Sequence, residues 1–157
     1  MMTMAQDRIM IAQQPNFTYT LEGRYRQTLD DARVQHINSV TTPAGKHSLF
    51  VAFGSDNLPI GPMVGLYAAV TRKGLSGEEL GAEERVLIQD AIRMYTANGP
   101  YLTWEEKSKG TLEVGKLADM VVLGADPLTS SPELLLKTKV DLTIIGGKTV
   151  YDRARKQ

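Results

Sequence analysis

The chain has 157 residues, of which 42% are hydrophobic and 23% are charged, a balance typical of a soluble globular protein. Eighteen basic residues offset eighteen acidic ones, so no net charge draws the whole chain to nucleic acid or anionic lipid. The absence of cysteine excludes disulfides, thiolate metal sites and a cysteine nucleophile. No apolar run approaches the roughly 18 residues of a membrane span, and the first residues do not resemble a signal peptide. We therefore expect a cytoplasmic protein with no membrane or nucleic-acid partner.

The first third of the chain contains one strand signal and one irregular helix signal. Residues 8–14 form an apolar-rich run that ends at Pro15, since proline cannot donate a hydrogen bond to a strand ladder. Residues 16–26 are polar and aromatic without clear periodicity, which predicts a loop. Apolar residues recur unevenly over 25–39, which predicts a helix that the proline and glycine of 42–45 then break.

The most informative stretch joins an apolar run to a turn that ends in an acidic residue. Five apolar residues, 49–53, run without a break into Gly54, Ser55 and Asp56. An unbroken run of this length predicts a strand that is buried on both faces, as in a parallel sheet. Sites in parallel α/β folds are built at the carboxyl ends of such strands, so Asp56 is a candidate catalytic residue. The alternative is that Asp56 caps its own backbone in an Asx turn before Pro59.

Two further helices are predicted in the middle of the chain. Residues 63–70 are largely apolar and follow Pro62, a residue favoured in the first turn of a helix. After a connector at 73–77, residues 82–97 carry apolar side chains at helical spacing and end at an Asn-Gly-Pro stop signal, 98–100. Four acidic residues flank the start of this helix: Glu78, Glu79, Glu83 and Glu84. Carboxylates there complement the helix dipole, so we expect a solvated acidic face rather than a metal site.

The carboxyl-terminal third has a different character, with short strands and glycine turns. Residues 118–123 are predicted to form a strand, and Ser131 with the proline after it predicts the start of a short helix. Residues 140–145 and 148–152 flank two consecutive glycines, which predicts a β-hairpin.

The remaining motifs do not support a common catalytic site. His36 and His47 are the only histidines and do not form the paired spacing of a zinc site, so each is expected to be a surface or capping residue. Residues 110–117 approach a phosphate-binding loop, but Leu117 stands where that loop needs a serine or threonine. A turn with Gly115 at positive φ explains this stretch without a nucleotide.

Short motifs are nevertheless spread along most of the chain. A Gln-Pro pair at 14–15 ends the first strand, and Phe-Gly-Ser-Asp at 53–56 ends the buried strand. The most distinctive motif, Gly-Thr-Leu-Glu-Val-Gly-Lys-Leu-Ala-Asp-Met-Val-Val-Leu at 110–123, precedes Asp-Pro at 126–127. Thr-Ile-Ile-Gly-Gly-Lys-Thr-Val-Tyr at 143–151 completes the series. In this order the motifs resemble the carboxyl-terminal portion of the metal-dependent amidohydrolase superfamily, in its YtcJ-like branch.

The resemblance implies an α/β fold in two parts. Residues 1–109 would be the last strands and helices of a (β/α)8 TIM barrel, and residues 110–157 a β-rich lobe of a composite β-sandwich. It also implies hydrolysis of non-peptide carbon–nitrogen bonds at a one- or two-metal site, usually zinc, whose metal lowers the pKa of a bound water. Asp56 then corresponds to the family's aspartate, which holds the metal or its water and transfers a proton to the leaving nitrogen. Asn57 and Pro59 would bind a small amide-type substrate.

The chain departs from the family pattern in its missing metal ligands. The family draws a His-x-His pair, a lysine or glutamate and two further histidines from earlier strands, and an eight-stranded barrel takes roughly 250 residues. We therefore expect the fragment of an enzyme, with an incomplete site that holds zinc only with further ligands or holds no metal. Unpaired strand edges favour association with another chain, which predicts a homo-oligomer or a missing N-terminal half as partner. The alternative is a non-catalytic remnant that acts as an oligomerising or binding module.

Overall fold

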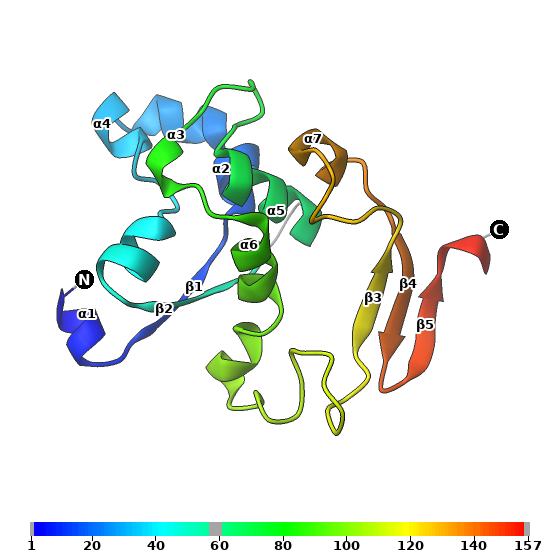
Figure 1. Cartoon of the computed structure of the whole chain (residues 1–157). Helices are drawn as coiled ribbons and strands as arrows, with labels where there is room; N and C mark the ends of the chain where they lie inside the picture. Colours follow the sequence, from blue (N-terminus) through cyan, green and yellow to red (C-terminus); the bar gives the residue numbers. More distant parts are fainter. Residues whose placement is uncertain (1, 57–60, 156–157) are drawn as a thin grey trace.

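The structure is a computed structural model that describes residues 2–56 and 61–155, and it contains two separate sheets (Figure 1). Figure 1 shows the sheet of β1 and β2 on the side of the amino terminus and the sheet of β3, β4 and β5 on the side of the carboxyl terminus. Helices α5 and α6 lie between the two sheets in this view, and α7 packs on α5. Mixed helices and strands confirm the predicted α/β class at this level.

The first sheet pairs β1, Met10–Gln13, with β2, Phe50–Phe53, in parallel. Val51, Ala52 and Phe53 are all buried, so neighbouring residues that point to opposite faces are both covered. The predicted doubly buried strand of a parallel sheet is therefore confirmed. The unbroken apolar run indicates burial on both faces, because a strand with one face exposed to solvent would alternate apolar and polar residues.

The segment between these strands differs from its prediction. The expected loop at 16–26 is wrong, because α2, Asn16–Thr20, and α3, Glu22–Thr28, fill this region. The expected helix at 25–39 is also wrong in extent, because the chain there forms only the end of α3 and the short helix α4, Asp31–Val34.

Local capping and a distant partner explain both differences. Leu29 adopts an extended conformation after α3, and the Asp30 side chain accepts a hydrogen bond from the Arg33 amide at 2.8 Å, which starts a new helix. Helix α2 is held from outside, because the Tyr19 ring packs edge-on against Tyr67 of α5 with 5.6 Å between ring centroids. Neither feature produces a helical period in the local sequence.

The central helices follow the sequence more closely. Helix α5, Pro62–Thr71, starts with the predicted proline. Helix α6, Ile88–Tyr95, is shorter than the predicted 82–97, because Ala82–Glu84 is a 3-10 turn and Arg85 after it is extended. The predicted helix is therefore interrupted at Glu83 and Glu84, which do not fit its apolar pattern. Other short elements are α1, Met2–Gln6, a π-helical turn, Thr42–Lys46, and 3-10 turns at Gly99–Thr103 and Arg153–Arg155.

The carboxyl-terminal elements are β3, Met120–Leu123, α7, Pro132–Leu135, β4, Val140–Ile145, and β5, Lys148–Asp152. They form an antiparallel sheet in the order β3-β4-β5. Gly146 and Gly147 both have positive φ, 55° and 79°, as a two-residue hairpin turn requires. The predicted strands, short helix and hairpin are therefore confirmed.

One hydrophobic cluster joins both parts of the chain. It contains Val40, Val51, Phe53, Leu66, Tyr67, Ala69, Ala91 and Leu135. Leu135 belongs to α7 and is only 1% exposed to solvent. The carboxyl-terminal segment therefore contributes a buried side chain to the core around β2. Within the described residues, none of the helices is long and apolar enough to span a membrane.

Candidate functional site

The candidate site lies at the carboxyl ends of β1 and β2. Because the two strands are parallel, both end at the same edge of their sheet. The Gly54 amide donates to the Gln13 carbonyl at 2.9 Å and extends the pairing one step beyond β2. The Asn16 side-chain amide then donates to the Ser55 carbonyl at 3.0 Å. These bonds fasten the turn after β2 to the segment after β1.

Asp56 follows this fastened turn and is exposed to solvent. Its φ of 53° is left-handed, a conformation that is uncommon for residues other than glycine but tolerated by aspartate. Asp56 therefore lies open to solvent at the end of the strand. Asn57 and Pro59, the expected substrate-binding residues, lie outside the described residues.

Asn16 is a component that sequence reasoning did not identify. Its side chain is fully buried, and its Oδ1 accepts no hydrogen bond from the described residues. Buried amide oxygens are normally paired, because leaving one unpaired costs free energy. The residue lies in a stretch that the sequence marked only as polar, so no periodic signal could have identified it.

A tyrosine from α6 completes the surroundings of the turn. The Tyr95 hydroxyl lies 3.5 Å from the Gly54 carbonyl oxygen, and its ring packs edge-on against Phe53 with 5.2 Å between centroids. Burial raises the pKa of Tyr95 to about 12, although a hydrogen bond with the Ser55 side chain acts in the opposite direction. The phenol therefore remains protonated at neutral pH and is available as a hydrogen-bond donor.

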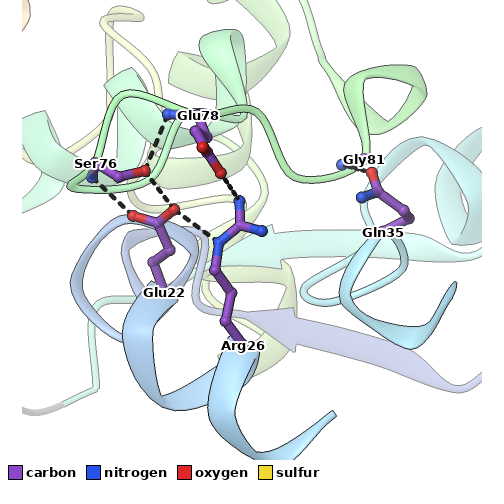
Figure 2. A network of polar contacts seen from close by, with 6 residues as sticks. All are labelled: Glu22, Arg26, Gln35, Ser76, Glu78 and Gly81. Atoms are coloured by element: carbon purple, nitrogen blue, oxygen red, sulfur yellow. Dashed lines mark hydrogen bonds and ion pairs between the residues drawn. The ribbon is translucent and has the colours of Figure 1, made fainter. Parts of the chain in front are cut away.

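Glu22 and Arg26 form a second polar cluster, which fastens a loop instead of building a site (Figure 2). Figure 2 shows both side chains pointing from α3 toward the loop that carries Ser76 and Glu78. One Glu22 oxygen accepts from the Ser76 amide at 2.8 Å and the other from the Ser76 hydroxyl at 2.6 Å. Arg26 bridges Glu22 at 3.1 Å and Glu78 at 2.8 Å. Burial alone would raise the pKa of Glu22, but these hydrogen bonds together hold it below its usual range.

The predicted solvated acidic face is wrong for Glu84. This side chain is 1% exposed and accepts hydrogen bonds from the Val40 amide at 2.8 Å, the Thr42 amide at 2.9 Å and the Thr42 hydroxyl. Burial opposes the charged form, but these three bonds and the charge of Arg72 hold the pKa of Glu84 below its usual range. Glu84 is therefore a structural carboxylate that joins residues far apart in the sequence.

Arg72 is the cationic counterpart in the same interior. Its guanidinium is fully buried and donates to the carbonyls of Leu80 at 2.9 Å, Ile37 at 2.6 Å and Asn38 at 3.1 Å. Burial lowers the pKa of Arg72 to about 10, against the attraction of Glu84. The guanidinium stays charged at neutral pH. Its N–H groups already donate to backbone carbonyls, so it is not available to a ligand.

The distinctive motif at 110–123 has a structural role in the fold. The Lys116 ammonium bonds the Thr111 hydroxyl at 2.7 Å and Glu113 at 3.0 Å within its own loop. Gly115 has a φ of 94°, and a strand, not a helix, follows the loop. The predicted turn with Gly115 at positive φ is therefore confirmed. Asp119 accepts from the Gly146 amide at 2.7 Å and ties the motif to the hairpin.

An open groove of about 800 Å³ lies between α6 and this motif. Ile92, Leu112 and Met120 contribute apolar walls, and Arg93 and Asp119 contribute charge. The groove also reaches one side of Tyr95 and so borders the structural support of the Asp56 turn.

The described residues do not fit a complete metal centre. Among residues 2–56 and 61–155, no group of three or more histidine, cysteine, aspartate or glutamate side chains could hold a metal ion. His36 is exposed and His47 is half-buried. Zinc sites in proteins use three or four protein ligands, whereas Asp56 contributes a single carboxylate.

Comparison with known proteins decides the family. A profile of the Amidohydrolase family (Amidohydro_3) matches residues 3–151. The chain belongs to the Amidohydrolase family. It is 31% identical over 99 residues to the protein named "Putative amidohydrolase YtcJ" of Bacillus subtilis (strain 168), a match over 61% of this chain. It is 32% identical over 88 residues to the N-substituted formamide deformylase of Arthrobacter pascens, over 56% of this chain. The resemblance to the YtcJ-like branch is confirmed.

This amidohydrolase chain spans a small part of its relatives. The matched regions are 19% of the Bacillus protein and 16% of the Arthrobacter protein. A crystal structure of an amidohydrolase from Thermotoga maritima MSB8 is similar with a TM-score of 0.61 at 20% identity, over 97% of this chain and 34% of that one. At this identity the likeness shows the fold.

Proposed function

We propose that the chain supplies the carboxyl-terminal part of a metal-dependent amidohydrolase that hydrolyses non-peptide carbon–nitrogen bonds of small molecules. The observation that carries the proposal is Asp56, an exposed carboxylate at the end of a doubly buried parallel strand in a chain of this family. Residues 1–109 would be the last strands and helices of a TIM barrel, and residues 110–157 the β-rich lobe of a composite sandwich. The parallel β1–β2 pair and the separate antiparallel sheet support this division.

In this proposal Asp56 moves the proton that hydrolysis requires. Its carboxylate accepts a proton from the attacking water and then donates it to the leaving nitrogen, so that one group acts first as base and then as acid. The solvent exposure of Asp56 supports this role, because water can approach the carboxylate. Asn57 and Pro59, which lie one and three positions after Asp56 in the sequence, would form one wall of the substrate pocket.

A divalent metal, zinc by preference, would need ligands beyond those described here. One carboxylate does not meet the three or four protein ligands of a zinc site, so the remaining ligands would come from a partner chain or a missing N-terminal half. β1 and β2 each pair only with the other among the described strands. Unpaired edges of this kind favour added strands, which supports association into an oligomer or a completed barrel.

Metal analysis of the chain purified without chelators, paired with a panel of amides that includes an N-substituted formamide, tests the proposal. About one equivalent of tightly held zinc together with hydrolysis is the expected result for an assembled site. Asp56→Asn should then lower kcat at least about 100-fold, in line with the loss of a general base. Asp90→Asn is the matched control, since Asp90 is also exposed but lies at the start of α6, and it should leave the rate unchanged.

A protein that binds no zinc and hydrolyses none of the panel, in any oligomeric state and also when mixed with a separately expressed N-terminal part of a relative, would refute the catalytic proposal. That result would favour the alternative, in which the chain is a non-catalytic remnant that oligomerises or binds a partner.

A further inference from the structure

Tyr95 reaches the candidate site through a slot in a neighbouring helix. Its ring leaves α6, passes α5 at Gly65 and ends beside the turn after β2. A methyl group added at Gly65 would overlap the Tyr95 hydroxyl and would lie 2.8 Å from the ring carbon that carries it. A side chain at this position of α5 would therefore displace the tyrosine. Glycine within a helix is less stable than alanine. At Gly65 the missing side chain leaves the space that the Tyr95 ring occupies.

The end of the ring is polar where packing alone would need no polar atom. The ring contacts Phe53 through its apolar surface, a contact that phenylalanine could also make. The hydroxyl instead lies beside the Gly54 carbonyl and bonds the Ser55 side chain. Burying a hydroxyl costs free energy unless it forms hydrogen bonds. Its partners are the two residues that immediately precede Asp56.

Asn16, the first residue of α2, holds the same turn from the side of β1. Its side-chain amide bonds the Ser55 carbonyl at 3.0 Å, and Gly54 donates to Gln13 at 2.9 Å. The turn is thus held by β1 and by Asn16 at the start of α2 on one side, and by Tyr95 of α6 on the other. Asp56 directly follows this held turn and adopts a left-handed backbone conformation.

We propose that Tyr95 is a positioning residue that, through the slot at Gly65, immobilises the Gly54–Ser55 turn and so orients the Asp56 carboxylate. The proposal deepens the proposed function and rests on it for the role of Asp56, but the clamp itself can be measured without any activity. The contacts of Tyr95 described above are with Phe53, Gly54 and Ser55. It acts only through the backbone that carries the aspartate.

Hydrogen exchange of the full chain tests the clamp. Tyr95→Phe removes the hydroxyl and keeps the ring, so the Gly54 amide should exchange about fivefold faster, the effect of losing one ordinary hydrogen bond. The Gly124 amide, which donates to Lys139 at 2.9 Å in the other part of the chain, should not change. Tyr101→Phe is the matched control, because Tyr101 is 46% exposed and its hydroxyl makes no hydrogen bond with the described residues.

A second variant tests the slot. Gly65→Ala should also speed exchange at Gly54, and the double variant with Tyr95→Phe should exchange no faster than Gly65→Ala alone, because both changes remove one contact. If Gly65→Ala does not fold, Ser55→Ala replaces it, since it removes the partner of the hydroxyl. A change below twofold at Gly54 in Tyr95→Phe, or an equal change at Gly124, would overturn the clamp.

The clamp and the proposed function fail in different ways. Where hydrolysis is measurable, Tyr95→Phe should lower kcat about fivefold with KM unchanged, whereas a general packing defect would also lower the melting temperature. A Gly54 amide that responds as expected in a protein without hydrolytic activity would retain the clamp and refute the proposed function. Unchanged exchange of the Gly54 amide in Tyr95→Phe, in a protein that hydrolyses the substrate, would refute the clamp and retain the proposed function.

Discussion

Replacement of Glu84 by alanine should destabilise the protein more than any change at the acidic residues beside it. The substitution leaves the buried amides of Val40 and Thr42 without their acceptor, and each unsatisfied group costs about 1–3 kcal/mol. It also removes the negative charge that attracts the buried Arg72. From the two unsatisfied amides we expect a total loss of about 4 kcal/mol.

Glu84→Gln separates the charge from the geometry. Glutamine keeps one oxygen that can accept from both backbone amides, and its NH2 group can donate to the Thr42 hydroxyl. Only the charge is lost, and hydrogen bonds to a charged group exceed neutral ones by about 1 kcal/mol. Glu84→Gln should therefore cost about 1–2 kcal/mol, clearly less than Glu84→Ala.

Urea unfolding followed by circular dichroism at pH 7 measures these losses. Glu83→Ala is the matched control, because Glu83 is the adjacent residue and is exposed, and exposed substitutions usually change stability by less than about 0.5 kcal/mol. The reasoning is refuted if Glu84→Ala unfolds within about 1 kcal/mol of the Glu83→Ala control.

Three further predictions concern pH, the fastened loop and the core. The pKa values of Glu22 and Glu84 are held below their ordinary value near 4.5. The stability that these two carboxylates contribute is therefore present above that pH and is lost as the pH falls through the lower pKa values of the folded state. The difference in unfolding free energy between wild type and Glu84→Gln should narrow in acid-unfolding curves below about pH 4.5. A methyl group at Gly74 would overlap the Glu22 carboxylate, so Gly74→Ala should cost about 1–3 kcal/mol and speed proteolysis of the loop, and an unaltered digestion rate would contradict the packing. Leu135→Ala should cost about 2–5 kcal/mol in thermal unfolding, whereas the neighbouring Leu134→Ala, at a residue that is 40% exposed, should cost well under half as much; equal losses would contradict the core assignment.

Several elements could be predicted because their signals are local. The hairpin of β4 and β5 follows from Gly146 and Gly147, whose backbone adopts the positive φ that the turn requires. Strand β2 follows from an unbroken apolar run, and α5 from an apolar stretch behind Pro62. In each case neighbouring residues alone supply the preference, so a distant partner is not needed to identify the element.

Other elements could not be predicted because their partners are distant. Helix α2 has no apolar period of its own, and its place is set by contacts such as Tyr19 with Tyr67. Glu84 lies in an acidic segment that resembles a solvated surface, but the amides of Val40 and Thr42 and the charge of Arg72 surround it after folding. Propensity describes what a segment prefers alone and does not contain these long-range terms.

The candidate site combines both kinds of information. The sequence by itself determined that an acidic residue follows a buried strand, because the apolar run and the Gly54–Ser55 turn are contiguous with Asp56. Only the tertiary structure decided how that residue is held, because Asn16 arrives from the neighbouring strand end and Tyr95 from α6. Both contacts depend on parallel pairing and helix packing, which bring together residues about 40 positions apart in the chain.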